Sequence, residues 1–170
     1  MTEYIAIKIQ DGITNTTRGI TVVELFRDKA PKHVERIIDL ANENFYNGIK
    51  FHRVIDGFMV QAGCPKGNGT GSSHKPDLQA EFNNIKHIEG VMSMARSNNP
   101  HSANSQFFIM LDSHPYLDGQ YTAFGKVVSG MEYIHEIRKG HGNNGSVDKP
   151  DLIEEMYICD ESGLRLSDEI

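Results

Sequence analysis

The chain has 170 residues, of which 17 are basic and 23 acidic, giving a formal net charge of −6. This length suits one well-packed core and predicts a single domain. The acidic balance excludes a general affinity for nucleic acid or for anionic membrane, because both need a basic surface. The first residues carry Glu3, Lys8 and Asp11, so they lack the apolar core of a signal peptide. The longest strictly apolar run, residues 107–111, is too short to span a membrane. We therefore expect a cytoplasmic protein.

Short alternating or apolar runs separated by Gly, Asn, Asp and Pro recur along the chain and predict about eight strands. These runs are residues 4–9, 20–26, 51–55, 58–62, 90–95, 106–111, 121–128 and 152–158. One segment, residues 31–42, has helical spacing instead. Its Val34, Ile37, Ile38 and Ala41 fall at i, i+3, i+4 and i+7, and Pro31 suits the first turn of a helix.

A second helix is predicted over residues 131–140, with Ile134 and Ile137 on one face and Gly140 as a stop signal. Many strands and few helices predict a mainly β fold: a closed eight-stranded antiparallel barrel capped by two α-helices, since closure removes the edge strands. Residues 1–160 are expected to form this single barrel domain, and residues 161–170 a polar C-terminal tail. Two irregular stretches, residues 64–84 and 97–105, are long enough to suggest functional loops.

The cysteines and histidines do not indicate a metal site. Cys64 and Cys159 are far apart and in no Cys-x-x-Cys arrangement. Two reduced thiols are the favoured interpretation, with a disulfide between them as the alternative. No two of the eight histidines lie within five residues, so neither predicted helix carries the i, i+4 pair of a zinc site. The cysteines and histidines therefore predict no metal site.

An arginine lies within a short apolar segment, FHRVIDGFMVQAG, at residues 51–63. On a strand, Arg53 shares a face with Phe51 and Ile55, and further along Gln106 shares a face with Phe108. Together these residues indicate a shallow apolar pocket with a fixed cation and amide groups. Arginine does not release its proton near neutral pH, and no nucleophile or carboxylate pair accompanies it. The pocket therefore suits the binding of an extended peptide.

Four motifs in order resemble the cyclophilins, the peptidyl-prolyl cis-trans isomerases. They are FHRVIDGFMVQAG, GNGTG at residues 67–71, SMARSNNPHSANSQFFIM at residues 93–110 and YLDGQYTAFGKVVSGM at residues 116–131. The similarity runs from about residue 4 to residue 158, and the MAR and SANSQFF forms look bacterial. The resemblance implies an eight-stranded barrel with two helices, an isomerase that works as a monomer without cofactor, and substrates that are proline-containing peptides and unfolded or nascent proteins.

By the same resemblance, Arg53 is the catalytic residue, aimed at the prolyl nitrogen of a twisted X-Pro bond. The residues implied in substrate binding are Phe58, Met59, Gln61, Ala95, Arg96, Gln106, Phe108, Tyr116, Leu117 and Tyr121. Gln61 would orient the arginine, and the backbone around Ala95 and Arg96 would pair with the residues before proline.

Two positions depart from the family pattern. Tyr116 stands where tryptophan is common, and Tyr121 where histidine is common. The tryptophan offers an indole N–H to cyclosporin in sensitive members, so we expect weak cyclosporin binding. A second functional class stays open: a proline-peptide binding module or holdase whose isomerase activity is incidental. Binding would tolerate the loss of Arg53, whereas rate acceleration would not.

Overall fold

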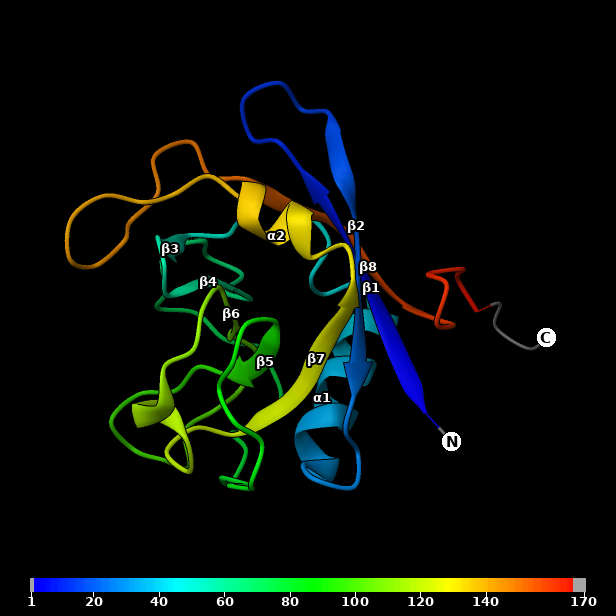
Figure 1. Ribbon diagram of the computed structural model, residues 1–170, viewed down its shortest axis with the longest axis vertical. Coiled ribbons are helices and arrows are strands. Elements are labelled where there is room, and N and C mark those ends of the chain that lie inside the picture. Colours follow the sequence, from blue (N-terminus) through cyan, green and yellow to red (C-terminus); the bar gives the residue numbers. More distant parts are fainter. Residues whose placement is uncertain (1, 167–170) are drawn as a thin grey trace.

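The computed structural model describes residues 2–166, which form one curled antiparallel sheet with two α-helices (Figure 1). Along the chain the elements are β1 (Glu3–Gln10), β2 (Thr17–Leu25), α1 (Pro31–Asn42), β3 (Arg53–Ile55), β4 (Met59–Ala62), β5 (Val91–Met94), β6 (Phe107–Met110), the 3₁₀ turn η1 (Pro115–Leu117), β7 (Ala123–Ser129), α2 (Met131–Glu136) and β8 (Leu152–Cys159). Each of the eight predicted strands is present, so the mainly β prediction is confirmed.

The sheet is open, and the prediction of a closed barrel is wrong. Its strand order is β3-β4-β6-β5-β7-β2-β1-β8, which leaves β3 and β8 as edges. The chain before β3 meets the start of β8 through an isolated bridge, Lys50 to Leu152, and a few backbone hydrogen bonds, such as that from the N–H of Ile153 to the carbonyl of Ile49 at 2.7 Å. β3 has three residues, and its outer edge meets Ser146 of an irregular loop instead of β8. Strand alternation predicts which face is buried, but it does not predict whether the two edges of a sheet meet.

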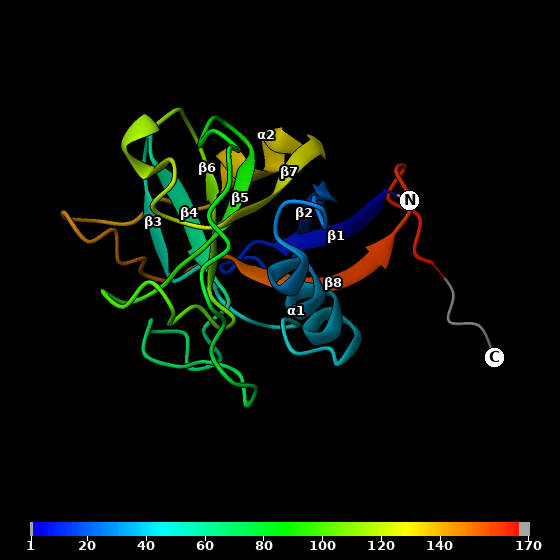
Figure 2. The same cartoon turned by 90° about the horizontal axis from the view of Figure 1, so that it is seen from below.

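The two helices cover the part of the sheet formed by β2, β7 and β8. α1 packs against β8 and β7 (Figures 1 and 2). It buries Val34, Ile37 and Ala41 as its spacing predicted, whereas Ile38 is only partly buried and Leu40 joins the core. α2 packs against β2 but ends at Glu136, four residues earlier than expected. Its C-cap, Ile137, adopts an extended ψ of 135° and stays fully buried. The apolar side chain is therefore retained in the core while the backbone leaves the helix.

Strand register separates a core face from a site face in the group β3, β4, β6 and β5, which lies together in both views (Figures 1 and 2). The cross-strand row in the main core is Val54, Val60, Ile109 and Met92. The row on the opposite face is Arg53, Gln61, Phe108 and Ser93. Phe51, expected beside Arg53, lies in the core instead, because the strand begins only at Arg53.

Several sequence expectations concern the rest of the chain. Cys64 and Cys159 are both free and buried, so the two-thiol interpretation holds. Residues 161–166 return along β8, where the N–H of Leu166 donates to the carbonyl of Ile158 at 3.1 Å. The remainder of the predicted tail, residues 167–170, lies outside the described residues. Within residues 2–166, no helix has the length and hydrophobicity needed to cross a membrane.

Candidate active site

Two adjoining cavities lie on the site face and collect the predicted residues. The first, of about 290 Å³, is lined by Arg53, Phe58, Met59, Gln61, Ala95, Arg96, Phe108, Tyr116, Leu117 and Tyr121. All ten were predicted from the sequence. The second cavity, of about 330 Å³, shares Gln61, Ala95 and Arg96 with the first and includes the eleventh predicted residue, Gln106. We call them the apolar cavity and the polar cavity.

The floor of the apolar cavity is a small buried cluster separate from the main core. Met59, Phe108 and Leu117 belong to it, and each is at most 6% exposed. The Phe108 ring meets the Tyr121 ring edge to face at 5.6 Å between centroids. It also lies 6.2 Å from the imidazole of His87, nearly parallel to it. Phe108 is therefore held from two sides.

A buried histidine supports this floor. His87 is 1% exposed, with Nδ1 3.1 Å from Oδ1 of Asp118 and Nε2 3.0 Å from the hydroxyl of Ser93. Burial lowers the pKa of His87, although the Asp118 carboxylate opposes that shift. The imidazole is therefore neutral near pH 7 and can serve as one donor and one acceptor to these two partners. Sequence reasoning missed this residue, since a lone histidine carries no spacing signal.

The rim of the apolar cavity is aromatic. Phe58 lies 4.8 Å from the His114 ring and 6.4 Å from the Tyr116 ring, measured between centroids. Nε2 of His114 is 2.9 Å from the carbonyl oxygen of Gly57 and fixes that ring against the turn between β3 and β4. Tyr116 is 66% exposed, so its side chain is available to a ligand. His114 is a second contributor that the sequence did not reveal.

Arg53 is oriented by a relay of neutral groups. Its Nη1 donates to Oε1 of Gln61 at 3.0 Å, and its Nε donates to the carbonyl of Asn144 at 2.8 Å. Nε2 of Gln61 donates in turn to Oε1 of Gln106 at 3.0 Å. Nε2 of Gln106 is anchored on the carbonyl of Gly69 at 3.0 Å, and on that of Gly71 at the same distance. The guanidinium is thus held in place without a neutralising carboxylate.

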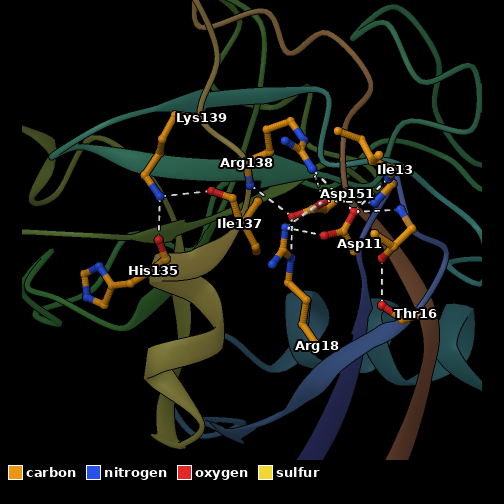
Figure 3. A network of polar contacts seen from close by, with 11 residues as sticks. Asp11, Ile13, Thr16, Arg18, His135, Ile137, Arg138, Lys139 and Asp151 are labelled. Atoms are coloured by element: carbon orange, nitrogen blue, oxygen red, sulfur yellow. Dashed lines mark hydrogen bonds and ion pairs between the residues drawn. The ribbon is translucent and has the colours of Figure 1, made fainter.

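The loop that supplies the Asn144 carbonyl is fixed near its tip and at its base. Near its tip, the N–H of Val54 donates to the carbonyl of Gly145 at 2.8 Å. At its base, the fully buried carboxylate of Asp151 accepts hydrogen bonds from the N–H of Gly12 and the N–H of Arg138, each at 3.0 Å (Figure 3). Charged side chains from β2 and from the segment after α2 surround Asp151 in the same view. The network therefore joins distant parts of the chain beside the loop that holds Arg53.

Arg96 lies where the two cavities meet. Its Nη2 and Nε donate to the carbonyl of Gln120 at 2.6 and 3.2 Å, and its Nη1 donates to the carbonyl of Ser97 at 2.9 Å. The guanidinium carbon is 4.4 Å from the centroid of the Tyr121 ring, a cation–π distance. The preceding Ala95 donates its N–H to the carbonyl of Gln106 at 2.9 Å.

The chemistry of the site follows from these groups. Among residues 2–166, no three His, Cys, Asp or Glu side chains gather in a way that would hold a metal ion. An apolar cavity beside an oriented cation accepts a small ring and places positive charge at its edge. Such a site polarises a bound group without exchanging protons, because arginine stays protonated.

Comparison with known proteins identifies the family. A family model described as "Cyclophilin type peptidyl-prolyl cis-trans isomerase/CLD" matches residues 11–158. The chain belongs to this family. The isomerase predicted from the four sequence motifs is thereby confirmed as a cyclophilin-type enzyme.

Curated relatives agree with this assignment. A probable peptidyl-prolyl cis-trans isomerase of Brucella suis is 51% identical over 152 residues, covering 82% of this chain and 78% of the relative. A peptidyl-prolyl cis-trans isomerase of Helicobacter pylori is 42% identical over 128 residues, covering 74% of this chain and 78% of the relative.

Solved structures show the same fold. The crystal structure of a cyclophilin-type peptidyl-prolyl cis-trans isomerase of Cryptosporidium parvum is 26% identical, with a TM-score of 0.82, over 95% of this chain and 99% of that one. A second structure of that protein, determined in the presence of the dipeptide Ala-Pro, has a TM-score of 0.80, also at 26% identity, over 93% and 99% of the two chains.

Proposed function

We propose that the apolar cavity receives the proline ring of an X-Pro substrate and that Arg53 accelerates rotation about the X-Pro bond. The observation that carries the proposal is the hold on Arg53: its guanidinium lies at the edge of the apolar cavity and is bound by neutral acceptors, the side chain of Gln61 and the carbonyl of Asn144. The cation is thus placed in advance and keeps its full charge.

The physical chemistry of amide rotation explains what this cation does. The C–N bond has partial double-bond character, and its rotation barrier is about 18–20 kcal/mol. Conjugation is lost in the twisted transition state, so the prolyl nitrogen regains a lone pair that accepts a hydrogen bond. A guanidinium aimed at that nitrogen stabilises the twisted state more than either planar state, which is the condition for catalysis. Each ~1.4 kcal/mol of this preference gives about a tenfold rate increase.

The neighbouring groups suit an extended peptide. We infer that the backbone at Ala95 and Arg96 pairs with the residues before proline, and that these residues continue into the polar cavity. Gln61 orients Arg53 and is near enough to the shared boundary of the cavities to contact the substrate carbonyl. The Cryptosporidium parvum structure determined in the presence of Ala-Pro supports a proline-containing ligand for this fold.

The wider biology is part of the proposal. We expect the substrates to be proline-containing peptides and unfolded or nascent proteins, with the chain acting as a cytoplasmic monomer and single domain that assists protein folding. We also expect weak cyclosporin binding, because the exposed Tyr116 offers a hydroxyl where related proteins offer an indole N–H.

The competing function is a proline-peptide binding module or holdase with incidental isomerase activity. It uses the same apolar cavity, and it differs only in what it requires of Arg53. The test is cis/trans exchange of an Ala-Pro peptide, followed by NMR, for the native protein and Arg53→Ala at equal folded fraction. We expect the variant to keep most of its peptide affinity and to lose most of the acceleration. Peptide binding by both proteins with acceleration by neither would favour the binding module.

A further inference from the structure

The arginines of this chain divide by the partners of their guanidinium groups. Four form ion pairs with carboxylates: Arg18, Arg27, Arg138 and Arg165. Arg36 is buried and donates to two backbone carbonyls. The other two, Arg53 and Arg96, have no ion pair within residues 2–166, and both line the apolar cavity. A chain of net charge −6 thus places its two partly exposed arginines without an acidic partner at the same site.

Arg96 is anchored by neutral groups on several sides. Three of its five N–H groups donate to the carbonyls of Gln120 and Ser97, and the guanidinium lies over the Tyr121 ring. These partners are neutral, so they orient the guanidinium without cancelling its charge. Two N–H groups remain for a further acceptor. An already immobilised arginine loses little side-chain entropy when it binds a carboxylate, which favours the pair over one made by a flexible lysine.

The position of Arg96 selects one residue of a bound peptide. It lines both cavities, whereas Phe58 and Tyr116 line only the apolar cavity and Ser102 lines only the polar one. With a proline ring in the apolar cavity and the preceding residues in the polar cavity, the residue immediately before proline crosses the boundary beside Arg96. Its side chain is therefore the one nearest to the free N–H groups.

The polar cavity carries the opposite charge further out. Asp77 is the only acidic residue among those that line the two cavities, and it lines only the polar one. Its Oδ1 accepts a hydrogen bond from Nδ2 of Asn104 at 3.0 Å. Along the expected path of a peptide, positive charge at Arg96 is thus followed by negative charge at Asp77. A substrate carboxylate is favoured beside the proline and is not favoured further upstream.

We propose that Arg96 is a specificity-determining residue that favours substrates with an aspartate or glutamate immediately before the proline. This inference rests on the proposed function, because it needs a proline in the apolar cavity. It deepens that function by naming a substrate class, acidic-residue–proline peptides, that the family assignment does not specify.

The test compares peptides that differ only in charge. Blocked peptides acetyl-Ala-Xaa-Pro-Ala-amide, with Xaa as Glu or Gln, are followed by NMR exchange at low salt. For the native protein we expect kcat/KM for Glu to exceed that for Gln by about threefold to fivefold, the range of a partly exposed ion pair. Arg96→Gln should reduce this ratio to about one to two. The separate variant Arg96→Lys, which keeps the charge, should retain part of the native preference for Glu. Added salt should lower the native ratio.

Two controls distinguish a local effect of Arg96 from the effect of the overall charge of the protein. Arg165→Gln removes the same unit of charge at the far side of the sheet, where residues 161–166 lie along β8, and should leave the ratio unchanged. Moving the glutamate one residue further from proline should abolish the preference. Equal kcat/KM for Glu and Gln in the native protein, or the same Glu/Gln ratio in Arg96→Gln, would overturn the inference while the isomerase activity stands. No acceleration of any peptide would instead contradict the proposed function itself.

Discussion

Gln61 accepts a hydrogen bond from Arg53, with its Oε1 3.0 Å from Nη1 of the guanidinium. The Nε2 of the same amide donates to Gln106. The orientation of the Gln61 amide is therefore fixed, because exchanging its oxygen and nitrogen would break both hydrogen bonds. An amide thus holds the cation at a position where a carboxylate would have neutralised it. The identity of this one side chain decides how much positive charge reaches the cavity.

Replacement of Gln61 by glutamate should therefore be more harmful than its removal. In Gln61→Glu the new carboxylate pairs with Arg53 and faces the Oε1 of Gln106, so the cation is neutralised and the relay is broken. We expect a loss of about tenfold or more in kcat/KM, equivalent to ~1.4 kcal/mol or more of transition-state stabilisation. Gln61→Ala, the matched control, leaves the charge in place and should lose less. Equal activities for Gln61→Glu and the native protein would show that the neutral hold is unimportant.

The ionic network of Figure 3 should contribute to stability in proportion to burial. Asp151 is fully buried and binds the guanidinium of Arg18 at 2.9 Å as well as two backbone N–H groups. Asp151→Asn should lower the free energy of unfolding by about 3 kcal/mol, because Arg18 loses its fully buried partner and keeps only Asp11, and because the new amide NH2 faces one of the two backbone N–H donors. Asp11→Asn, in the same network but closer to solvent, should cost much less, because ion pairs exposed to water contribute little to stability. Urea unfolding measures both, and equal losses would contradict the assignment.

Histidine burial predicts a pH dependence of stability. Burial lowers the pKa of His87 from its usual value near 6.5, despite the opposing effect of Asp118. The unfolded chain therefore binds a proton near pH 6.5 that the folded chain binds only at lower pH. The stabilisation is complete above pH 6.5 and is lost as the pH falls toward the folded pKa.

We accordingly expect the free energy of unfolding to fall between pH 7 and pH 5, with a shallower fall in His87→Gln. His33, whose pKa burial also lowers, should account for part of the remaining slope. Urea titrations at several pH values give the slopes directly. Identical slopes for the native protein and His87→Gln would show that His87 does not remain neutral in the folded state.

The exposed ring of Tyr116 gives a prediction for inhibitor binding. The native protein should bind cyclosporin weakly, and Tyr116→Trp should strengthen binding by about tenfold, roughly the value of one added hydrogen bond. Isothermal titration calorimetry would measure both affinities. Nanomolar affinity of the native protein would refute the importance of this position, and Tyr121→His offers the comparison at the second departing position.

The strands and the residues of the cavities were accessible from sequence for separate reasons. Alternating or wholly apolar runs marked every strand in the sequence, although β4, β5 and β6 are buried on both faces. The ordered motifs pointed by resemblance to the residues that line the cavities. Closure of the barrel was not predictable, because it depends on the three-residue length of β3 and on the loop that meets its edge. The early end of α2 was not predictable either. Ile137 fits the helical spacing of apolar residues in the sequence, but its backbone is extended.

Only one of the two hydrogen-bond acceptors that orient Arg53 could be predicted from the sequence. Gln61 was identified, but the second acceptor is a backbone carbonyl at Asn144, 91 residues away in sequence. A carbonyl is present in every residue and leaves no compositional trace. His87 and His114 were missed because their contributions depend on which rings the fold brings beside them.

The central claim is that Arg53 accelerates rotation by charge and geometry rather than by retaining the peptide. The most direct measurement is the exchange rate of one Ala-Pro peptide, at saturation and below it, for the native protein, Arg53→Lys and Arg53→Ala. We predict that kcat falls by about a hundredfold or more in Arg53→Ala while peptide affinity changes only a fewfold, with Arg53→Lys in between because it keeps the charge but loses the planar fork. An unchanged kcat in Arg53→Ala, with only KM raised, would contradict the claim and leave Arg53 as a binding residue.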